Sequence, residues 1–212
     1  MKERGMIFNG EMVRAILDGR KTQTRRPVKF PVHDKNLGCE LAGNELAGEL
    51  SAGNYLNSAF GKPGDRIWVR ETFCPVDDTQ YGGEKWVDYR ATPKFEASHP
   101  AGWDSAPNDA EALKWRPSIH MPRWASRILL EITDVRVERL NAISEEDARA
   151  EGIIDGGCLN CGEPEPCGCA NPEPDATDAF AYLWQSIYGQ ESWNDNPWVW
   201  VISFKRVEGG AA

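Results

Sequence analysis

The stretch from Arg127 to Leu140 decides the fold class, and it reads RILLEITDVRVERL. Ile128, Leu130 and Ile132 share one face of an extended chain, because side chains alternate along a strand. The opposite face carries a mixture of apolar and polar residues. This pattern predicts a long strand whose alternating apolar side chains pack against a core.

Further elements are predicted on both sides of this strand. Helices are predicted after Asn9, after Ser144 in a capping box and after Thr177, since these residues are typical N-caps. The helix after Asn9 should end near Gly19, and the one after Ser144 near Glu151. Strands are predicted at residues 66–73, at residues 127–140 and at residues 198–207.

Loop-rich segments separate these elements, and we expect a single domain over residues 1–212 with three insertions. The insertions lie at about residues 33–63, 77–117 and 156–174. The second one contains a possible short strand at residues 85–90 and a short helix near residues 110–114. Strands and helices do not alternate regularly, which argues against a doubly wound sheet. The expected fold is α+β, a small mixed or antiparallel β-barrel with a few flanking helices.

Composition restricts the classes of partner. The chain has 212 residues, with 24 Lys plus Arg against 33 Asp plus Glu and a formal net charge of −9. A polyanion-binding protein usually has a basic excess, so a long nucleic acid is not the expected ligand, although a pocket for one nucleotide is allowed. The first ten residues show no signal-peptide pattern and no apolar stretch could span a bilayer, so a cytoplasmic protein is expected.

The run Gly19-Arg20-Lys21-Thr22-Gln23-Thr24-Arg25 resembles the signature of the ASCH superfamily, which follows an N-terminal helix as it does here. Gly64-Asp65 before a hydrophobic strand resembles the second landmark of that family. The segment from Trp193 to Trp200 is similar to longer members from phages and prophages. The resemblance implies a PUA-like β-barrel with a cleft of nucleobase size.

One bacterial branch of this family hydrolyses N(4)-acetylcytidine, and the resemblance implies Lys21, Thr24 and Glu151 as the catalytic residues. Thr24 would attack the acyl carbonyl, Lys21 would take its proton, and Glu151 would protonate the leaving amine or orient Lys21. In a straight strand, positions 21 and 24 point to opposite faces. The assignment therefore requires a bend in the chain between Gly19 and Pro27.

Each of these residues also has a structural interpretation. Lys21 and Thr24 could belong to a solvated loop, and Glu151 to a solvated acidic helix face. Arg26 and Trp68 are the candidate substrate-binding residues, for a phosphate or carboxylate and for base stacking, although a strand tryptophan is more often core. The alternative function is non-catalytic binding of RNA or a modified base by a protein of phage origin.

A cysteine cluster lies in the third insertion, with Cys158 and Cys161 followed by Cys167 and Cys169. Four thiolates at this spacing suit a structural zinc ion with tetrahedral geometry. Free thiols in a loop are the alternative, and so are disulfides formed on oxidation. Four sulfur ligands would leave no open position, so no cofactor is expected to take part in catalysis.

Overall fold

The computed structural model describes residues 1–77, 79, 83–94, 114–154 and 176–207. The chain divides into two compact units. The first comprises residues 1–2, 18–65 and 131–205, and the second comprises residues 3–17, 66–130 and 206–212. Both combine helices with strands, which confirms the α+β class. No helix within the described ranges is long and apolar enough to cross a membrane.

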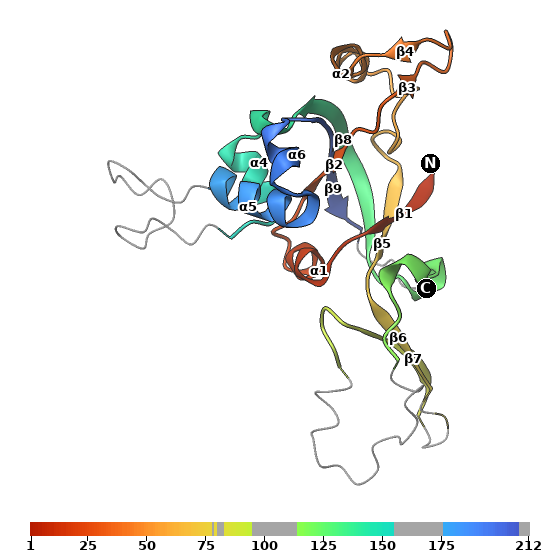
Figure 1. The fold of residues 1–212 in the computed structure, drawn as a ribbon. Coiled ribbons are helices and arrows are strands. Elements are labelled where there is room, and N and C mark those ends of the chain that lie inside the picture. The colour runs from red at the N-terminus through yellow and green to blue at the C-terminus, as the bar shows by residue number, and fades with distance from the viewer. Residues whose placement is uncertain (78, 80–82, 95–113, 155–175, 208–212) are drawn as a thin grey trace, which may run out of the picture. The chain divides into compact units, whose positions relative to one another are not determined.

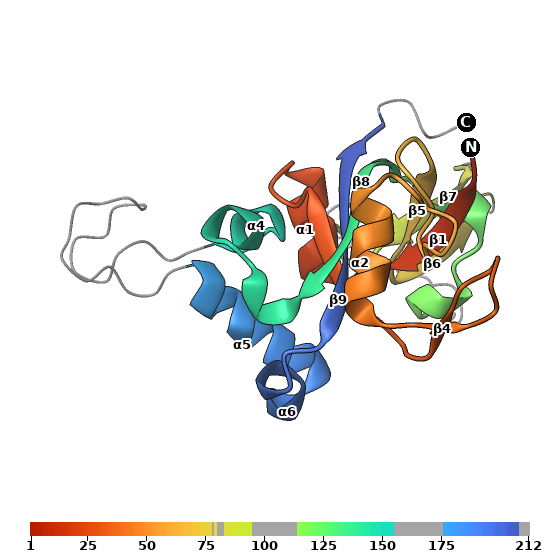
Figure 2. The same ribbon diagram turned by 90° about the horizontal axis from the view of Figure 1, so that it is seen from above.

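The first unit contains all or most of five strands and four α-helices among its described residues. Its strands are β2 (Gln23–Pro27), β3 (Val32–His33), β4 (Glu40–Leu41), most of β8 (Leu129–Arg139) and nearly all of β9 (Trp198–Arg206). Its helices are α2 (Gly43–Ser51), α4 (Glu145–Ala150), α5 (Ala176–Tyr188) and α6 (Gln190–Asn194). The helices α4, α5 and α6 gather on one side of β2 and β9 (Figures 1 and 2).

The second unit contains α1 (Gly10–Leu17) and the strands β1 (Glu3–Ile7), β5 (Arg66–Arg70), β6 (Phe73–Asp77) and β7 (Lys85–Tyr89). β1 and β5 pair in parallel, and β6 and β7 form an antiparallel hairpin. Asn9 caps α1, because its side-chain oxygen accepts a hydrogen bond from the Met12 amide at 2.8 Å.

The main sheet has the hydrogen-bonded order β1-β5-β8-β9-β2, and β8 contributes residues to both units. β2 and β9 are antiparallel, with Thr24 opposite Ile202 and Arg26 opposite Trp200. This order is that of an open five-stranded sheet with two end strands. The α+β class is therefore correct, whereas the closed barrel is not confirmed.

A hydrophobic core joins α4 and α5 of the first unit to β9. Its buried residues come from α4, α5, β9 and the turn after β8: Leu140, Ala148, Ala176, Phe180, Trp184, Val199 and Val201. Glu145 accepts hydrogen bonds from the amides of Ala176 and Thr177 at 2.9 and 3.1 Å, and so caps α5 from α4. The expected cap, Thr177, thus lies inside α5, because a carboxylate distant in sequence serves that helix terminus.

Two predictions from the sequence are corrected by the structure. The polar run after Gly19 was expected to bend, but residues 23–27 form strand β2 in regular register with β9. Residues 33–63 were expected to be mostly irregular, but they contain the β3–β4 hairpin and α2. The polar and glycine-rich composition of this segment gives only a weak local propensity for helix or strand. Packing, such as that of Gly43 in α2 against Trp198 of β9, outweighs this weak propensity.

Gly43 and Gly48 of α2 offer a matched pair of substitutions. A Cβ atom added at Gly43 would overlap the indole ring of Trp198, whereas one at Gly48 would meet nothing within 4 Å. We expect Gly43→Ala to lower the free energy of unfolding by about 1–3 kcal/mol through overpacking. Gly48→Ala should raise it by about 0.5–1 kcal/mol, because alanine favours a helix interior over glycine. Urea denaturation of both variants measures the difference, and equal effects would contradict the packing.

Candidate functional site

The first unit contains a buried cluster of charged side chains between β2 and α4. An extended chain at residues 21–27 places Lys21, Gln23 and Arg25 on one face, because alternate side chains point the same way. Lys21 itself forms an antiparallel bridge with Glu151, and the Thr22 amide donates to the Ala150 carbonyl at 2.8 Å. These backbone contacts fix the C-terminal end of α4 against the start of β2.

Lys21 and Glu151 form the centre of this cluster. The Lys21 Nζ atom donates to the Glu151 Oε2 atom at 2.6 Å and to the Glu151 carbonyl oxygen at 2.8 Å. The two side chains are 0% and 3% exposed. Burial lowers the pKa of the Lys21 ammonium, and the adjacent Glu151 carboxylate opposes that shift without reversing it. The pair therefore places a lysine with a lowered pKa against a carboxylate in a site closed to bulk solvent.

Arg25 links this pair to two further carboxylates. Its Nη1 atom donates to Glu151 Oε1 at 3.3 Å and to the Gln23 side-chain oxygen at 2.6 Å. Its Nη2 atom donates to Glu138 Oε1 at 2.7 Å and to Asp147 Oδ2 at 2.9 Å. One guanidinium thus holds three carboxylates together, which its planar fork of donors makes possible.

Arg136 completes an outer set of ion pairs. It donates to Glu138 Oε2 at 3.1 Å and to Asp147 Oδ2 at 2.7 Å, so that both carboxylates are shared with Arg25. Burial disfavours ionisation of Asp147, but the Gln23 amide and the two guanidiniums outweigh it and lower the Asp147 pKa. These six charged side chains comprise three cations and three carboxylates, and Arg136 also reaches the half-buried Asp134 at 3.5 Å, at the solvent side of the cluster.

Thr24 lies on the opposite face of β2 from Lys21. Its hydroxyl is buried and has no hydrogen-bond partner among the described residues, so the Lys21 amine does not contact it. The bend that would bring the two groups together is absent, because residues 23–27 follow a regular strand paired with β9. The structure thus brings together Lys21 and Glu151, and it does not bring Thr24 to them.

The remaining predicted site residues lie elsewhere. Arg26 is half-buried on β2, on the face that Thr24 shares, and its charge contributes to lowering the Lys21 pKa. Trp68 lies on β5 in the second unit, where the Arg70 guanidinium is 5.3 Å from its ring centre. Cys158, Cys161, Cys167 and Cys169 fall outside the described residues. Within those residues no cluster of three or more metal-ligating side chains occurs.

Sequence reasoning named Arg25 with Arg26 as a candidate carboxylate-binding residue, but it missed the other residues that surround the pair, namely Gln23, Arg136, Glu138 and Asp147. A signal for them exists in the sequence. Asp147 and Glu151 are four positions apart and share one face of α4, and Arg136 and Glu138 are two apart on β8. Such charged residues recur at the spacing that places side chains on one face of a helix or strand. When that face is buried, they indicate ion pairs, because burial of a single unpaired charge costs much free energy.

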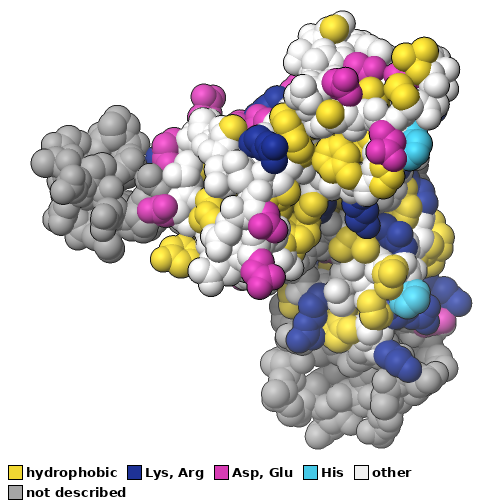
Figure 3. All heavy atoms as spheres, turned by 45° about the horizontal axis from the view of Figure 1, so that its top comes forward, with side chains coloured by type: hydrophobic (Ala, Val, Ile, Leu, Met, Phe, Trp, Pro, Cys, Tyr) yellow, Lys and Arg dark blue, Asp and Glu magenta, His cyan; other side chains and the backbone are white. Residues whose placement is uncertain are grey.

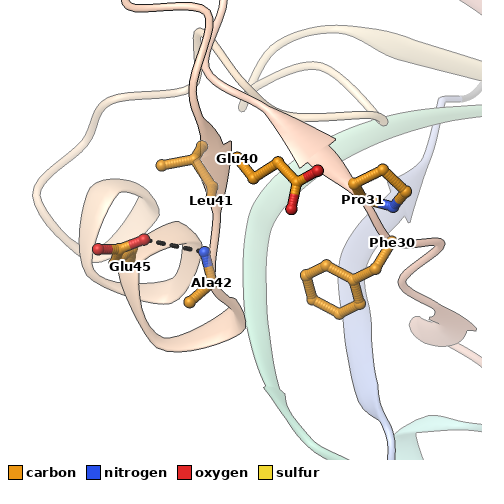
Figure 4. Close-up of a pocket in the computed structure, with 6 residues that line it drawn as sticks. All are labelled: Phe30, Pro31, Glu40, Leu41, Ala42 and Glu45. Carbon is orange, nitrogen blue, oxygen red and sulfur yellow. Dashed lines mark hydrogen bonds between the residues drawn. The ribbon is translucent and has the colours of Figure 1, made fainter.

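A separate surface hollow of about 640 Å³ lies beside α2, lined by Phe30, Pro31, Glu40, Leu41, Ala42 and Glu45. Figure 4 shows the Glu40 carboxylate directed toward Pro31, and Glu45 accepting the Ala42 amide at 2.9 Å. Acidic and hydrophobic side chains lie next to one another on this part of the surface (Figure 3). Lys21, Thr24 and Glu151 do not line this hollow, so it is distinct from the charged cluster.

Comparison with known proteins leaves the family open. No family model matches the sequence, and no curated protein matches it. A solved structure with some similarity is that of protein EF3133 from Enterococcus faecalis V583, described with the family model DUF984. It is 11% identical, the match covers 98% of this chain and 81% of that chain, and the TM-score is 0.36.

Proposed function

We propose that the protein is an amide hydrolase that removes an acyl group from the N(4) amine of cytidine or a related modified nucleoside. The proposal combines the ASCH-like signature with one observation, the buried 2.6 Å contact between Lys21 and Glu151. A lysine whose pKa is lowered next to a carboxylate can give and take protons, as hydrolysis of an amide requires.

In the proposed reaction, water attacks the acyl carbonyl and passes a proton to the Glu151 carboxylate. The carbon–nitrogen bond then breaks, and the Lys21 ammonium gives a proton to the departing amine. The products are the free amine and a carboxylic acid. A proton returns from Glu151 to Lys21 along the hydrogen bond between them, so both groups regain their starting charge. Water is the nucleophile in this scheme because the Thr24 hydroxyl lies on the other face of β2.

Access to the pair requires movement of the protein. Because the Lys21 and Glu151 side chains are 0% and 3% exposed, the proposed reaction requires an opening of the site, and we propose that α4 separates from β2. Opening of this kind is common at sites that exclude water during a reaction. Substrate should therefore change hydrogen exchange at the Thr22 amide, which bonds to Ala150 at this junction.

The test is incubation of the purified protein with N(4)-acetylcytidine, with cytidine release followed by chromatography. Lys21→Arg should abolish turnover, because arginine keeps the positive charge beside Glu151 but does not release its proton. Thr24→Val should retain turnover. Loss of activity in a folded Thr24→Val variant would instead make Thr24 the nucleophile, and no turnover by the wild-type protein would contradict the proposed function.

Glu71→Gln provides a control for loss of stability alone. Glu71 is buried and pairs with Arg127 through two contacts of 3.0 Å in the second unit. Burial raises the Glu71 pKa despite this pairing. The variant should be destabilised in the same way as variants of the Lys21–Glu151 pair, while its folded fraction keeps full turnover.

A second candidate function is non-catalytic binding of RNA or a modified base by the second unit. The observation that favours it is the outer face of β5, where Arg70 stacks on Trp68. Exposed Trp124 and Arg123 lie on one short helical turn of the same unit. Aromatic rings with arginines suit single-stranded nucleic acid. Salt-dependent RNA binding that Trp68→Ala abolishes would support this function, whereas binding independent of salt and of Trp68 would contradict it.

A further inference from the structure

We infer that Arg25 is a positioning residue, which holds the Glu151 carboxylate in place against Lys21. The inference rests on the proposed function for its chemical meaning, but its geometry is independent of that function. Lys21 engages one oxygen of the Glu151 carboxylate and Arg25 engages the other. With both oxygens bound, rotation of the carboxylate away from Lys21 would break two contacts at once.

Arg25 is itself held by several contacts besides the one to Glu151. Glu138 and Asp147 accept from its Nη2 atom at 2.7 and 2.9 Å, and the Gln23 side chain accepts from Nη1. The Phe180 ring lies against the guanidinium, with 5.7 Å between its centre and the Arg25 Cζ atom. These contacts come from four different elements, so the guanidinium has little freedom to follow Glu151 if that carboxylate moves.

The burial of the charged groups decreases outward from the pair. The side chains of Lys21, Arg25 and Glu151 are at most 3% exposed, whereas Glu138, Asp147 and Arg136 are 20%, 22% and 33% exposed. Among the described residues, only Arg25 pairs both with the outer carboxylates Glu138 and Asp147 and with Glu151. A lysine could not replace it, because an ammonium lacks the fork that spans all three carboxylates.

Arg136 offers a matched control for Arg25. It contacts the same two carboxylates, Glu138 and Asp147, and also Asp134, but within the described residues it forms no ion pair with Glu151. Arg25→Met and Arg136→Met each remove one guanidinium from these shared ion pairs. Only the first removes a contact to Glu151, so a difference between the two variants reports on the position of that carboxylate.

The experiment is proton–nitrogen NMR of the Lys21 ammonium, with the signal assigned by its absence in Lys21→Arg. A buried ammonium bonded to a fixed carboxylate exchanges its protons slowly and gives a visible cross-peak. We expect the cross-peak to be lost or broadened in Arg25→Met and Arg25→Lys, and kept in Arg136→Met. With N(4)-acetylcytidine, kcat should fall on the order of 100-fold in Arg25→Met with little change in KM.

The outcomes separate this inference from the proposed function. If wild-type protein shows no turnover while the cross-peak behaves as expected, the proposed function fails and the positioning role stands. A cross-peak kept in folded Arg25→Met, or lost equally in Arg136→Met, overturns the positioning role. Should Arg25→Met not fold, Asp147→Asn removes one of the carboxylates that hold Arg25, and it should broaden the same cross-peak.

Discussion

Replacement of Lys21 by methionine is expected to lower the free energy of unfolding by about 3–5 kcal/mol. The Lys21 side chain is 0% exposed, and its amine is bonded both to the carboxylate and to the carbonyl of Glu151. Methionine fills a similar volume but leaves the Glu151 carboxylate buried with one fewer cation. The cost therefore comes mainly from an uncompensated charge, and urea denaturation monitored by tryptophan fluorescence measures it.

A double variant tests this explanation directly. Lys21→Met with Glu151→Met removes both charges, and Arg25 keeps its bonds to Gln23, Glu138 and Asp147. We expect the double variant to be less destabilised than the sum of the two single variants, because neither charge is left alone. Additive losses would show that packing, and not charge, dominates at this position.

An exposed ion pair of the same unit provides the control. Lys205 contacts Glu131 at 2.9 Å, and its side chain is 63% exposed. Lys205→Met should change the free energy of unfolding by at most about 1 kcal/mol, because water and salt screen such pairs. A similar loss in Lys21→Met and Lys205→Met would contradict the distinction between the buried and the exposed pair.

Replacement of Trp184 by alanine is expected to cost about 3–5 kcal/mol of the free energy of unfolding. Trp184 on α5 is 2% exposed and lies in the core that joins α4, α5 and β9. Its ring centre is 4.4 Å from that of Tyr188 and 6.1 Å from that of Phe180. Its indole nitrogen donates to the Ser192 hydroxyl at 3.1 Å, which ties α5 to α6.

Tyr182 lies two residues away on the same helix and is 74% exposed. Tyr182→Ala should change the free energy of unfolding by less than about 0.5 kcal/mol, apart from a small change in helix propensity. Thermal unfolding of the two variants compares the faces of α5 directly. The assignment of the buried face would be wrong if Tyr182→Ala were the more destabilising substitution.

The sequence predicted the local elements well where one strong pattern applied. The apolar alternation of residues 127–140 corresponds to β8, and Asn9 and Ser144 cap α1 and α4 as their residue types indicate. It predicted β2 poorly, because GRKTQTR carries no apolar periodicity. Its strand character comes from pairing with β9, more than 170 positions further along the chain. The expected meeting of Lys21 and Thr24 failed for the same reason.

Local patterns in the sequence thus predicted the helices and strands with strong caps or apolar alternation, and a family resemblance singled out Lys21, Thr24 and Glu151. Only the tertiary structure decided which charges meet. Lys21 and Glu151 are 130 positions apart in the sequence, and Arg25 on β2 contacts Glu138 on β8. Such contacts depend on the register of β2 against β9 and on how α4 packs beside them. A hydrogen bond requires atoms within about 3 Å, and no pattern along the chain fixes distances between distant segments to that precision.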